Sequence, residues 1–322
     1  MIHPLTHPVH RFFIPVMGTG FTIDTPLKVA RYGISSVVSL VDDVLIEQMR
    51  SKVAEAAGRA YAAIGDRDED ARARRITAYL DLMNDLVQEQ VSRLRDSAFT
   101  AGSEITRYYE MLPPSPLRRL YDRMLQVRNP ALRARLQKAL RERIVPGGID
   151  VNIMTKLDRA RVARGEDPSA ESSDAMAALR GYARSKVQSS LVLSAGLNRK
   201  LYSYLREFSD FMPDGDGAMA KRIVLKVSDF RSARVQGTLL AKMGLWVSEY
   251  RIESGLNCGG HAFGGAGTLM GPILEEFRRE RKELTRKLHA TWCEGLAQLG
   301  RATPAEMPGL RVTVQGGIGT AE

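Results

Sequence analysis

Short apolar runs of strand length recur along this 322-residue chain, and segments with helical periodicity separate them. The seven runs are residues 12–17, 35–40, 149–154, 190–194, 222–227, 245–252 and 310–314. Helical segments follow the first run at residues 25–32 and separate the later runs at residues 173–186, 199–208, 232–243 and 272–299. Parallel strands need a crossover connection, which is usually a helix. The alternation therefore predicts an α/β fold with a parallel sheet.

Seven strands in succession favour a (β/α)₈ TIM barrel with seven strands present and the eighth missing. A closed sheet needs its last strand, and the chain ends at Glu322, so we interpret it as a fragment of a longer barrel protein. A doubly wound open sheet is the alternative. It is disfavoured because the turn Gly18-Thr19-Gly20 lacks the third glycine of a dinucleotide-binding motif.

One long segment interrupts the alternation. Residues 44–146 have helical patterns only, with a break at Pro113, Pro114 and Pro116, and they are too long for one barrel helix. We interpret them as a helical insertion between strands two and three, and we assign residues 1–43 and 147–322 to the barrel. The insertion is a lid over the site, a surface for a homo-oligomer, or decoration.

Composition limits the class of protein. The formal net charge is +10, and excess arginine attracts nucleic acid or an anionic cofactor. Many arginines stand beside Asp and Glu in helical segments, so we favour solvated helix faces and expect no nucleic-acid partner. The two cysteines, Cys258 and Cys293, form no CxxC motif and fit a reducing compartment. With neither a signal peptide nor a 20-residue apolar run, we expect a cytoplasmic protein with no membrane partner.

A glycine-rich turn after the sixth strand carries the best candidate for proton transfer. His261 follows Gly259 and Gly260, and glycine lets a flat ligand approach the backbone closely. Histidine exchanges a proton near neutral pH, so we expect His261 to be catalytic rather than a loop histidine that bonds only backbone. Cys258 is either a nucleophile or, as we favour, a small buried apolar residue.

Two further glycine turns follow strands. Gly316, Gly317 and Gly319 offer unobstructed backbone N–H groups to a phosphate after strand seven, and Gly18 and Gly20 offer a flat backbone after strand one. In both places the alternative is a tight turn that needs glycine for its shape alone.

Three polar positions at strand ends complete the candidates. Lys226 lies in an apolar strand, where a charge is costly unless it reaches a ligand or pairs with a carboxylate such as Glu253. Asn152 ends strand three and either bonds a ligand or closes the strand. Asp42 and Asp43 follow strand two, and we expect them to cap the next helix.

Several of these motifs resemble the nitronate monooxygenases and the related FMN-dependent enoyl reductases. Residues 255–261 are similar to the family's Gly-x-Glu-Ala-Gly-Gly-His motif, with Asn257 and Cys258 in place of Glu and Ala. Residues 15–18 resemble its first-strand turn, Val151-Asn152-Ile153 resembles its flavin-contacting Val-Asn-Leu, and residues 316–318 resemble its phosphate loop. Lys226 resembles the strand lysine beside the flavin in FMN barrels such as dihydroorotate dehydrogenases.

The resemblance implies an FMN-dependent oxidoreductase that acts on a small-molecule substrate, with His261 in proton transfer and no metal. The residues that it assigns to FMN are Met17, Gly18, Gly20, Asn152, Lys226, Gly259, Gly260, Gly316, Gly317 and Gly319. Three alternatives remain: an NAD(P)H-dependent enoyl-thioester reductase, a barrel that binds a phosphate-bearing ligand without catalysis, and a protein whose helical insertion is an interaction module for a partner.

Overall fold

The computed structural model describes residues 9–16, 18, 22–40, 42–153, 158, 173–194, 196–253 and 270–315. The chain forms two compact units. Unit 1 comprises Met1–Val151 with Arg184–Ser189, and unit 2 comprises Asn152–Ala183 with Ser190–Glu322. The predicted insertion, residues 44–146, lies within unit 1, and the predicted division into barrel and insertion stays a prediction.

Seven strands form the sheet, and they follow chain order. They are β1 (Phe13–Ile14), β2 (Ser35–Ser39), β3 (Ile149–Ile153), β4 (Ser190–Leu193), β5 (Arg222–Val227), β6 (Val247–Glu253) and β7 (Arg311–Gln315). Each pair with a defined register is parallel: β1 with β2 in unit 1, and β4 with β5, β5 with β6, and β6 with β7 in unit 2. The predicted α/β class and parallel sheet are confirmed.

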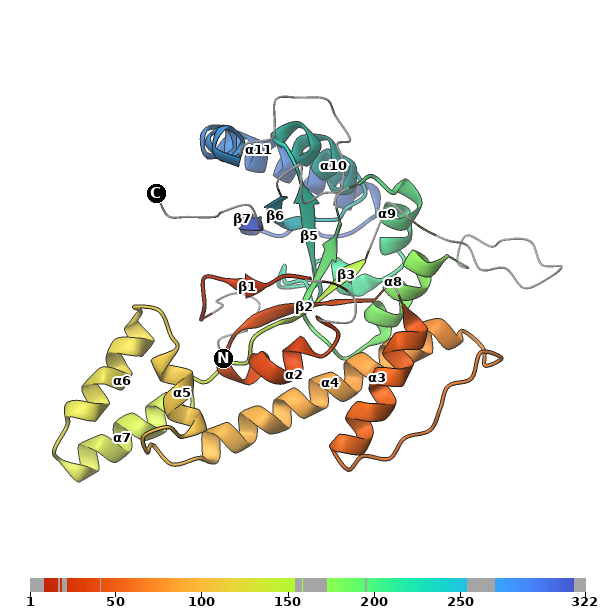
Figure 1. Cartoon of the computed structure of the whole chain (residues 1–322). Helices are drawn as coiled ribbons and strands as arrows, with labels where there is room; N and C mark the ends of the chain where they lie inside the picture. Colours follow the sequence, from red (N-terminus) through yellow and green to blue (C-terminus); the bar gives the residue numbers. More distant parts are fainter. Residues whose placement is uncertain are drawn as a thin grey trace. The chain divides into compact units, whose positions relative to one another are not determined.

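Unit 1 consists mostly of helices (Figure 1). They are α2 (Thr25–Val29), the 3₁₀ turn η1 (Ala30–Tyr32), α3 (Asp43–Ala56), α4 (Ala71–Asp96), α5 (Glu104–Glu110), α6 (Pro116–Gln126) and α7 (Pro130–Arg141). The longest, α4, buries a stripe at helical spacing that includes Ile76, Tyr79, Leu80 and Met83. The Tyr79 hydroxyl donates to the Ile23 carbonyl at 2.7 Å, which ties α4 to the segment before α2.

Local sequence explains where these helices begin and end. Asp42 caps α3 as expected, because its carboxylate accepts from the Leu45 amide at 3.0 Å. The predicted helix 25–32 tightens into η1 and ends at Gly33, whose φ of 78° suits glycine. The first strand is shorter than predicted, with two residues in place of six.

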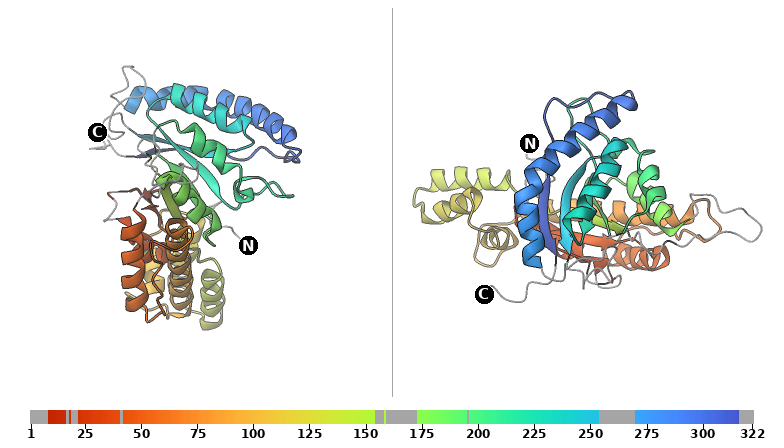
Figure 2. Two further views of the ribbon diagram at one scale, coloured as in Figure 1. Left: turned by 90° about the vertical axis from the view of Figure 1, so that its right-hand side faces the viewer. Right: turned by 90° about the horizontal axis from the view of Figure 1, so that it is seen from above.

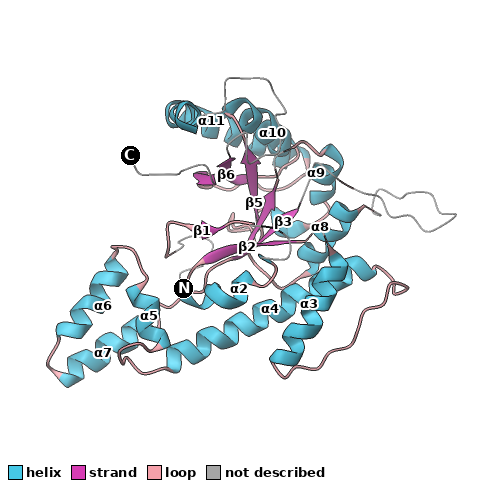
Figure 3. Ribbon diagram, viewed as in Figure 1, coloured by secondary structure: helices cyan, strands magenta, loops and turns pink. Residues whose placement is uncertain are grey.

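Unit 2 carries helices beside β4–β7 (Figures 2 and 3). They are α8 (Asp174–Arg184), α9 (Arg199–Leu205), the 3₁₀ turn η3 (Ser209–Phe211), α10 (Phe230–Lys242) and α11 (Met270–Gln298). Helices α10 and α11 can pack closely because Gly295 of α11 has no Cβ. A Cβ at this position would clash with the Ala241 carbonyl of α10. The Trp292 indole donates to the Gly244 carbonyl at 2.8 Å and fixes the end of this pair. Within the described residues, no helix combines the length and the apolar content needed to cross a membrane.

Candidate functional site

A register shift in β6 decides which side chains reach each face of the sheet in unit 2. Ile223 pairs with Val247, but the next residue of β5, Val224, pairs with Glu249. Ser248 is therefore an extra residue, a β-bulge. Because side chains alternate along a strand, a shift of one residue moves every later side chain of β6 to the other face.

Tyr250 shows the result on the face that α10 and α11 cover. After the shift it pairs with Leu225, and its hydroxyl donates to the Ala233 carbonyl of α10 at 3.0 Å. Its ring also lies 6.2 Å from the ring of Phe277 in α11. Without the bulge, Glu249 would occupy this apolar position. The bulge thus directs the tyrosine to the helices and the charged residues of β6 to the opposite face.

The opposite face carries a buried charge network centred on Glu249. Its carboxylate accepts from Arg251 Nε at 2.9 Å, from Arg311 Nη2 at 2.7 Å and from Thr313 Oγ1 at 2.7 Å. The side chains of Glu249 and Arg251 are each 2% exposed, whereas that of Arg311 is 50% exposed. Two of the three donors, Arg311 and Thr313, lie on β7, so this buried carboxylate links β6 to β7.

The pKa of Glu249 lies below its ordinary value. Burial alone raises this pKa, but the positive charge of Arg251, the hydrogen bond from Thr313 and the charge of Arg311 outweigh burial. The carboxylate is therefore ionised at neutral pH, and Glu249 is a structural anion rather than a proton donor.

A second ion pair lies closer to the carboxyl end of the strands. Lys226 Nζ is 3.0 Å from Glu253 Oε1, and their side chains are 12% and 5% exposed. Gln315 Nε2 donates to the same oxygen at 2.7 Å. Of the two alternatives for Lys226, the structure shows the pair with Glu253. An ammonium group has three N–H donors and this pair occupies one, so the pair does not prevent ligand binding. We call the seven residues Lys226, Glu249, Arg251, Glu253, Arg311, Thr313 and Gln315 the strand-face network.

Asn152 of β3 lies on the same face of the sheet. The Ser194 amide donates to the Ile153 carbonyl at 3.3 Å, which sets the register of β3 against β4. The register of β4 against β5 then places Asn152 at the same level as Val224 of β5. Val224 lies two residues before Lys226. Residues level with each other in a parallel sheet point to the same face. Asn152 and Lys226 therefore share a face, with one strand between theirs.

The Asn152 side chain has an unused hydrogen-bond acceptor. The residue is 5% exposed, and no donor among the described residues reaches its Oδ1. A buried polar atom without a partner costs about 1–3 kcal/mol. A ligand with an N–H or O–H group at this position would recover that energy.

The predicted site residues divide into three groups. Asn152 and Lys226 share the sheet face just described. Gly18 has a φ of 141°, which favours glycine, and its carbonyl accepts from the Thr22 amide at 3.3 Å, as the tight-turn alternative expects; it belongs to unit 1. The others lie outside the described residues: Met17, Gly20, Cys258, Gly259, Gly260, His261, Gly316, Gly317 and Gly319.

Sequence reasoning missed Glu249, Arg251, Arg311 and Thr313. One signal was available, because charged residues alternate with Tyr250 and Ile252 along residues 249–253. Such alternation marks a strand with one polar and one apolar face.

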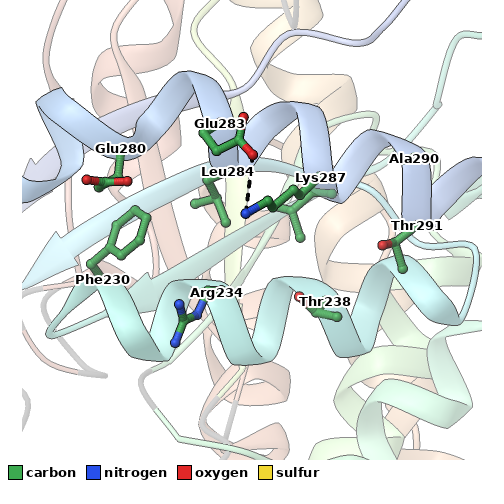
Figure 4. A pocket seen from close by; sticks show the side chains of 10 residues that line it. Phe230, Arg234, Thr238, Glu280, Glu283, Leu284, Lys287, Ala290 and Thr291 are labelled. Atoms are coloured by element: carbon green, nitrogen blue, oxygen red, sulfur yellow. Dashed lines mark ion pairs between the residues drawn. The ribbon is translucent and has the colours of Figure 1, made fainter.

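A groove of about 460 Å³ lies apart from the strands, between α10 and α11 (Figure 4). It is lined by Phe230, Arg234, Thr238, Glu280, Glu283, Leu284, Lys287, Leu288, Ala290 and Thr291. Lys287 and Glu283 form an ion pair of 3.2 Å at its rim. None of the lining residues comes from a strand, so the groove is separate from the strand-face network.

The chain was compared with known proteins at three levels. No family model, no curated protein and no solved structure matches it.

Proposed function

We propose that this chain is an FMN-dependent oxidoreductase resembling nitronate monooxygenase. The observation that carries the proposal is the buried Oδ1 atom of Asn152, which has no donor among the described residues. It lies on the third strand, where the resemblance expects a flavin-contacting asparagine. The finer fold in this proposal is a (β/α)₈ barrel.

The described residues fit a flavin at two points. Asn152 Oδ1 would accept from an N–H group of the ring, and Lys226 would place a positive charge on the same sheet face. Glu253 already offsets part of that charge, so Lys226 orients the ligand more than it neutralises it. Glycine turns would hold the phosphate, as the resemblance implies for Gly316, Gly317 and Gly319.

The chain's own residues would transfer a proton and position the ligand. A bound flavin supplies hydride or electron transfer. His261 would hold or move the proton at the reacting carbon of the substrate, and the strand-face network would keep Lys226 and Asn152 in place. A positioned acid or base contributes typically 10²–10⁴-fold to a rate.

Flavin absorbance and FMN titration test the proposal. The purified protein is examined for flavin bands, and the apoprotein is titrated with FMN while the quenching of flavin fluorescence is followed. Asn152→Ala removes the acceptor and should weaken FMN binding about 10-fold, because one buried hydrogen bond contributes about 1–1.5 kcal/mol.

Ser36→Ala is the matched control. Ser36 is buried on β2 and its Oγ also has no partner among the described residues, but it belongs to unit 1. This variant should bind FMN like the unaltered protein. No flavin bands and no quenching at millimolar FMN would reject the proposal, and equal weakening by both variants would remove Asn152 from the site.

A further inference from the structure

Helices α6 and α7 form an antiparallel hairpin in unit 1 (Figure 1). We call residues 116–143 the basic hairpin. Stacked tyrosines anchor it, because the ring of Tyr121 lies 5.1 Å from that of Tyr109 with an angle of 11° between them. The Tyr109 hydroxyl donates to the Leu140 carbonyl at 2.6 Å, and Arg141 donates to the Ser97 carbonyl at 2.7 Å. The hairpin is therefore fixed to α5 and to the end of α4.

Positive charge is concentrated in the basic hairpin. Its nine basic residues are Arg118, Arg119, Arg123, Arg128, Arg133, Arg135, Lys138, Arg141 and Arg143. Its two acidic residues are Asp122 and Glu142. Nine against two gives +7, out of a formal net charge of +10 for the whole chain. This segment therefore accounts for most of the excess charge.

Five of the basic side chains are exposed and have neither an ion pair nor a side-chain hydrogen bond within the part of the chain that the structure describes. They are Arg119, Arg123, Arg128, Arg135 and Lys138. Arg118, by contrast, bonds Asp122 at 2.9 Å. Arg119 and Arg123 also repel each other, since residues four apart on a helix are neighbours. The described part of the fold forms no ion pair or side-chain hydrogen bond with these five residues, so they can bind an external anion.

The chemistry of the side chains favours phosphate as that anion. Eight of the nine basic residues are arginines, and the planar guanidinium binds phosphate oxygens in pairs. Each helix is about 16–18 Å long, which spans several phosphates of a nucleic-acid strand.

A bilayer surface fits the basic hairpin less well. A helix that lies in a membrane needs a broad apolar face directed at the lipid. Tyr121 and Met124 of α6 are each 2% exposed and Leu140 of α7 is fully buried, because these faces pack inside unit 1. The large apolar side chains exposed on the hairpin are only Leu125 and Leu132.

We propose that the basic hairpin binds the phosphodiester backbone of a nucleic acid without regard to sequence. This departs from the expectation of no nucleic-acid partner, which was based on arginines standing beside Asp and Glu. That description suits α11, where Arg278 bonds Glu275 and Arg286 bonds Glu283, but it does not suit the hairpin. The proposal is independent of flavin binding.

Salt-dependent binding tests it. The full chain is titrated against fluorescein-labelled 24-base-pair duplexes of DNA and of RNA, by anisotropy, between 50 and 300 mM KCl. If five side chains each contact a phosphate, the logarithm of the affinity should fall against the logarithm of the salt concentration with a slope of about −4.5 for duplex DNA. The variant with Arg119, Arg123, Arg128, Arg135 and Lys138 changed to Gln should reduce the magnitude of that slope by about 4.5 and bind at least about 100-fold more weakly at 50 mM.

A matched variant keeps the test specific. This variant changes five exposed basic residues of α11 in unit 2 to Gln: Arg278, Arg279, Arg281, Lys282 and Arg286. It loses as much positive charge as the hairpin variant, but its affinity for the duplexes should fall far less. Changing Arg119, Arg123, Arg128 and Arg135 to lysine preserves the charge and should preserve the slope. Far-UV circular dichroism checks that each variant is folded.

Three results would overturn the proposal. The unaltered chain could fail to bind either duplex at 50 mM KCl. The hairpin and α11 variants could lose affinity equally, so that net charge alone explains binding. The chain could bind vesicles rich in phosphatidylserine but no duplex, so that the partner is a membrane surface. Binding to one duplex and not the other supports the proposal and names the nucleic acid.

Discussion

The strand-face network and the basic hairpin use charge in opposite ways. In the network, acids and bases alternate across β5, β6 and β7, and Glu249 and Arg251 are almost completely buried against each other. In the hairpin, five basic side chains are exposed to solvent and form no ion pair among the described residues. Charged residues of similar type are therefore paired in the buried network, whereas these five exposed residues are unpaired within the described part of the chain.

The physical reason is the cost of removing a charge from water. A buried ion needs a partner because its lost hydration is worth several kcal/mol, so removing a partner from the network should destabilise unit 2. An exposed ion keeps its hydration and needs no partner. Buried charges are thus explained by the fold, whereas a cluster of exposed charges of one sign indicates a binding partner of opposite charge.

The largest effect is expected from Glu249→Gln. This substitution takes an ionised acceptor from Arg251, Arg311 and Thr313 at once, and should lower the free energy of unfolding of unit 2 by about 3–5 kcal/mol. Urea unfolding followed by tryptophan fluorescence measures it specifically, because both tryptophans, Trp246 and Trp292, belong to unit 2.

Glu283→Gln on α11 is the control for that measurement. Glu283 pairs with Arg286 in the same unit, but at an exposed position where water replaces a lost partner. Its unfolding midpoint should not differ from that of the unaltered protein. If the two substitutions had equal effects, burial would not be what separates the two kinds of charge.

A smaller effect is expected from pH. Because the folded state lowers the pKa of Glu249, its contribution to stability is complete above the ordinary carboxyl pKa and is lost as the pH falls through the lowered value. The unfolding midpoint of unit 2 should therefore fall as the pH is lowered from the ordinary carboxyl pKa through the lowered pKa of Glu249. Glu249→Gln should show a shallower fall over the same interval. Identical slopes for the two proteins would mean that Glu249 does not titrate as described.

Much of the fold could be predicted because its signals are local. The strand at residues 222–227 has the predicted bounds, since an apolar run between polar flanks needs no long-range information. The helix after it starts two residues earlier than predicted, at Phe230, because Asp229 caps it by accepting from the Ser232 amide at 2.6 Å. That cap was visible in the sequence and was overlooked.

The candidate site was less predictable because it depends on register. Lys226 was recognisable as a charge in an apolar run, and Glu253 was named as one of its possible partners. The clustering of Glu249 with Arg311 depends on the bulge at Ser248, which no local pattern specifies. Likewise, no sequence pattern shows that Asn152 Oδ1 lacks a donor, because that depends on every neighbour in space.

The smallest effect, and the one of opposite sign, is expected for stability in the basic hairpin. Changing Arg119 to Gln removes both the repulsion from Arg123 one turn away and a positive charge from the first turn of α6, and should raise the free energy of unfolding of unit 1 by a few tenths of a kcal/mol. Far-UV ellipticity follows the helices of both units, so the transition of unit 1 is the part of the ellipticity change that the tryptophan fluorescence of unit 2 does not report. Added salt should narrow the difference, because it screens exposed like charges but hardly affects buried pairs. A loss of more than about 1 kcal/mol would show that Arg119 supports the fold, and would remove the reason for assigning it to a partner.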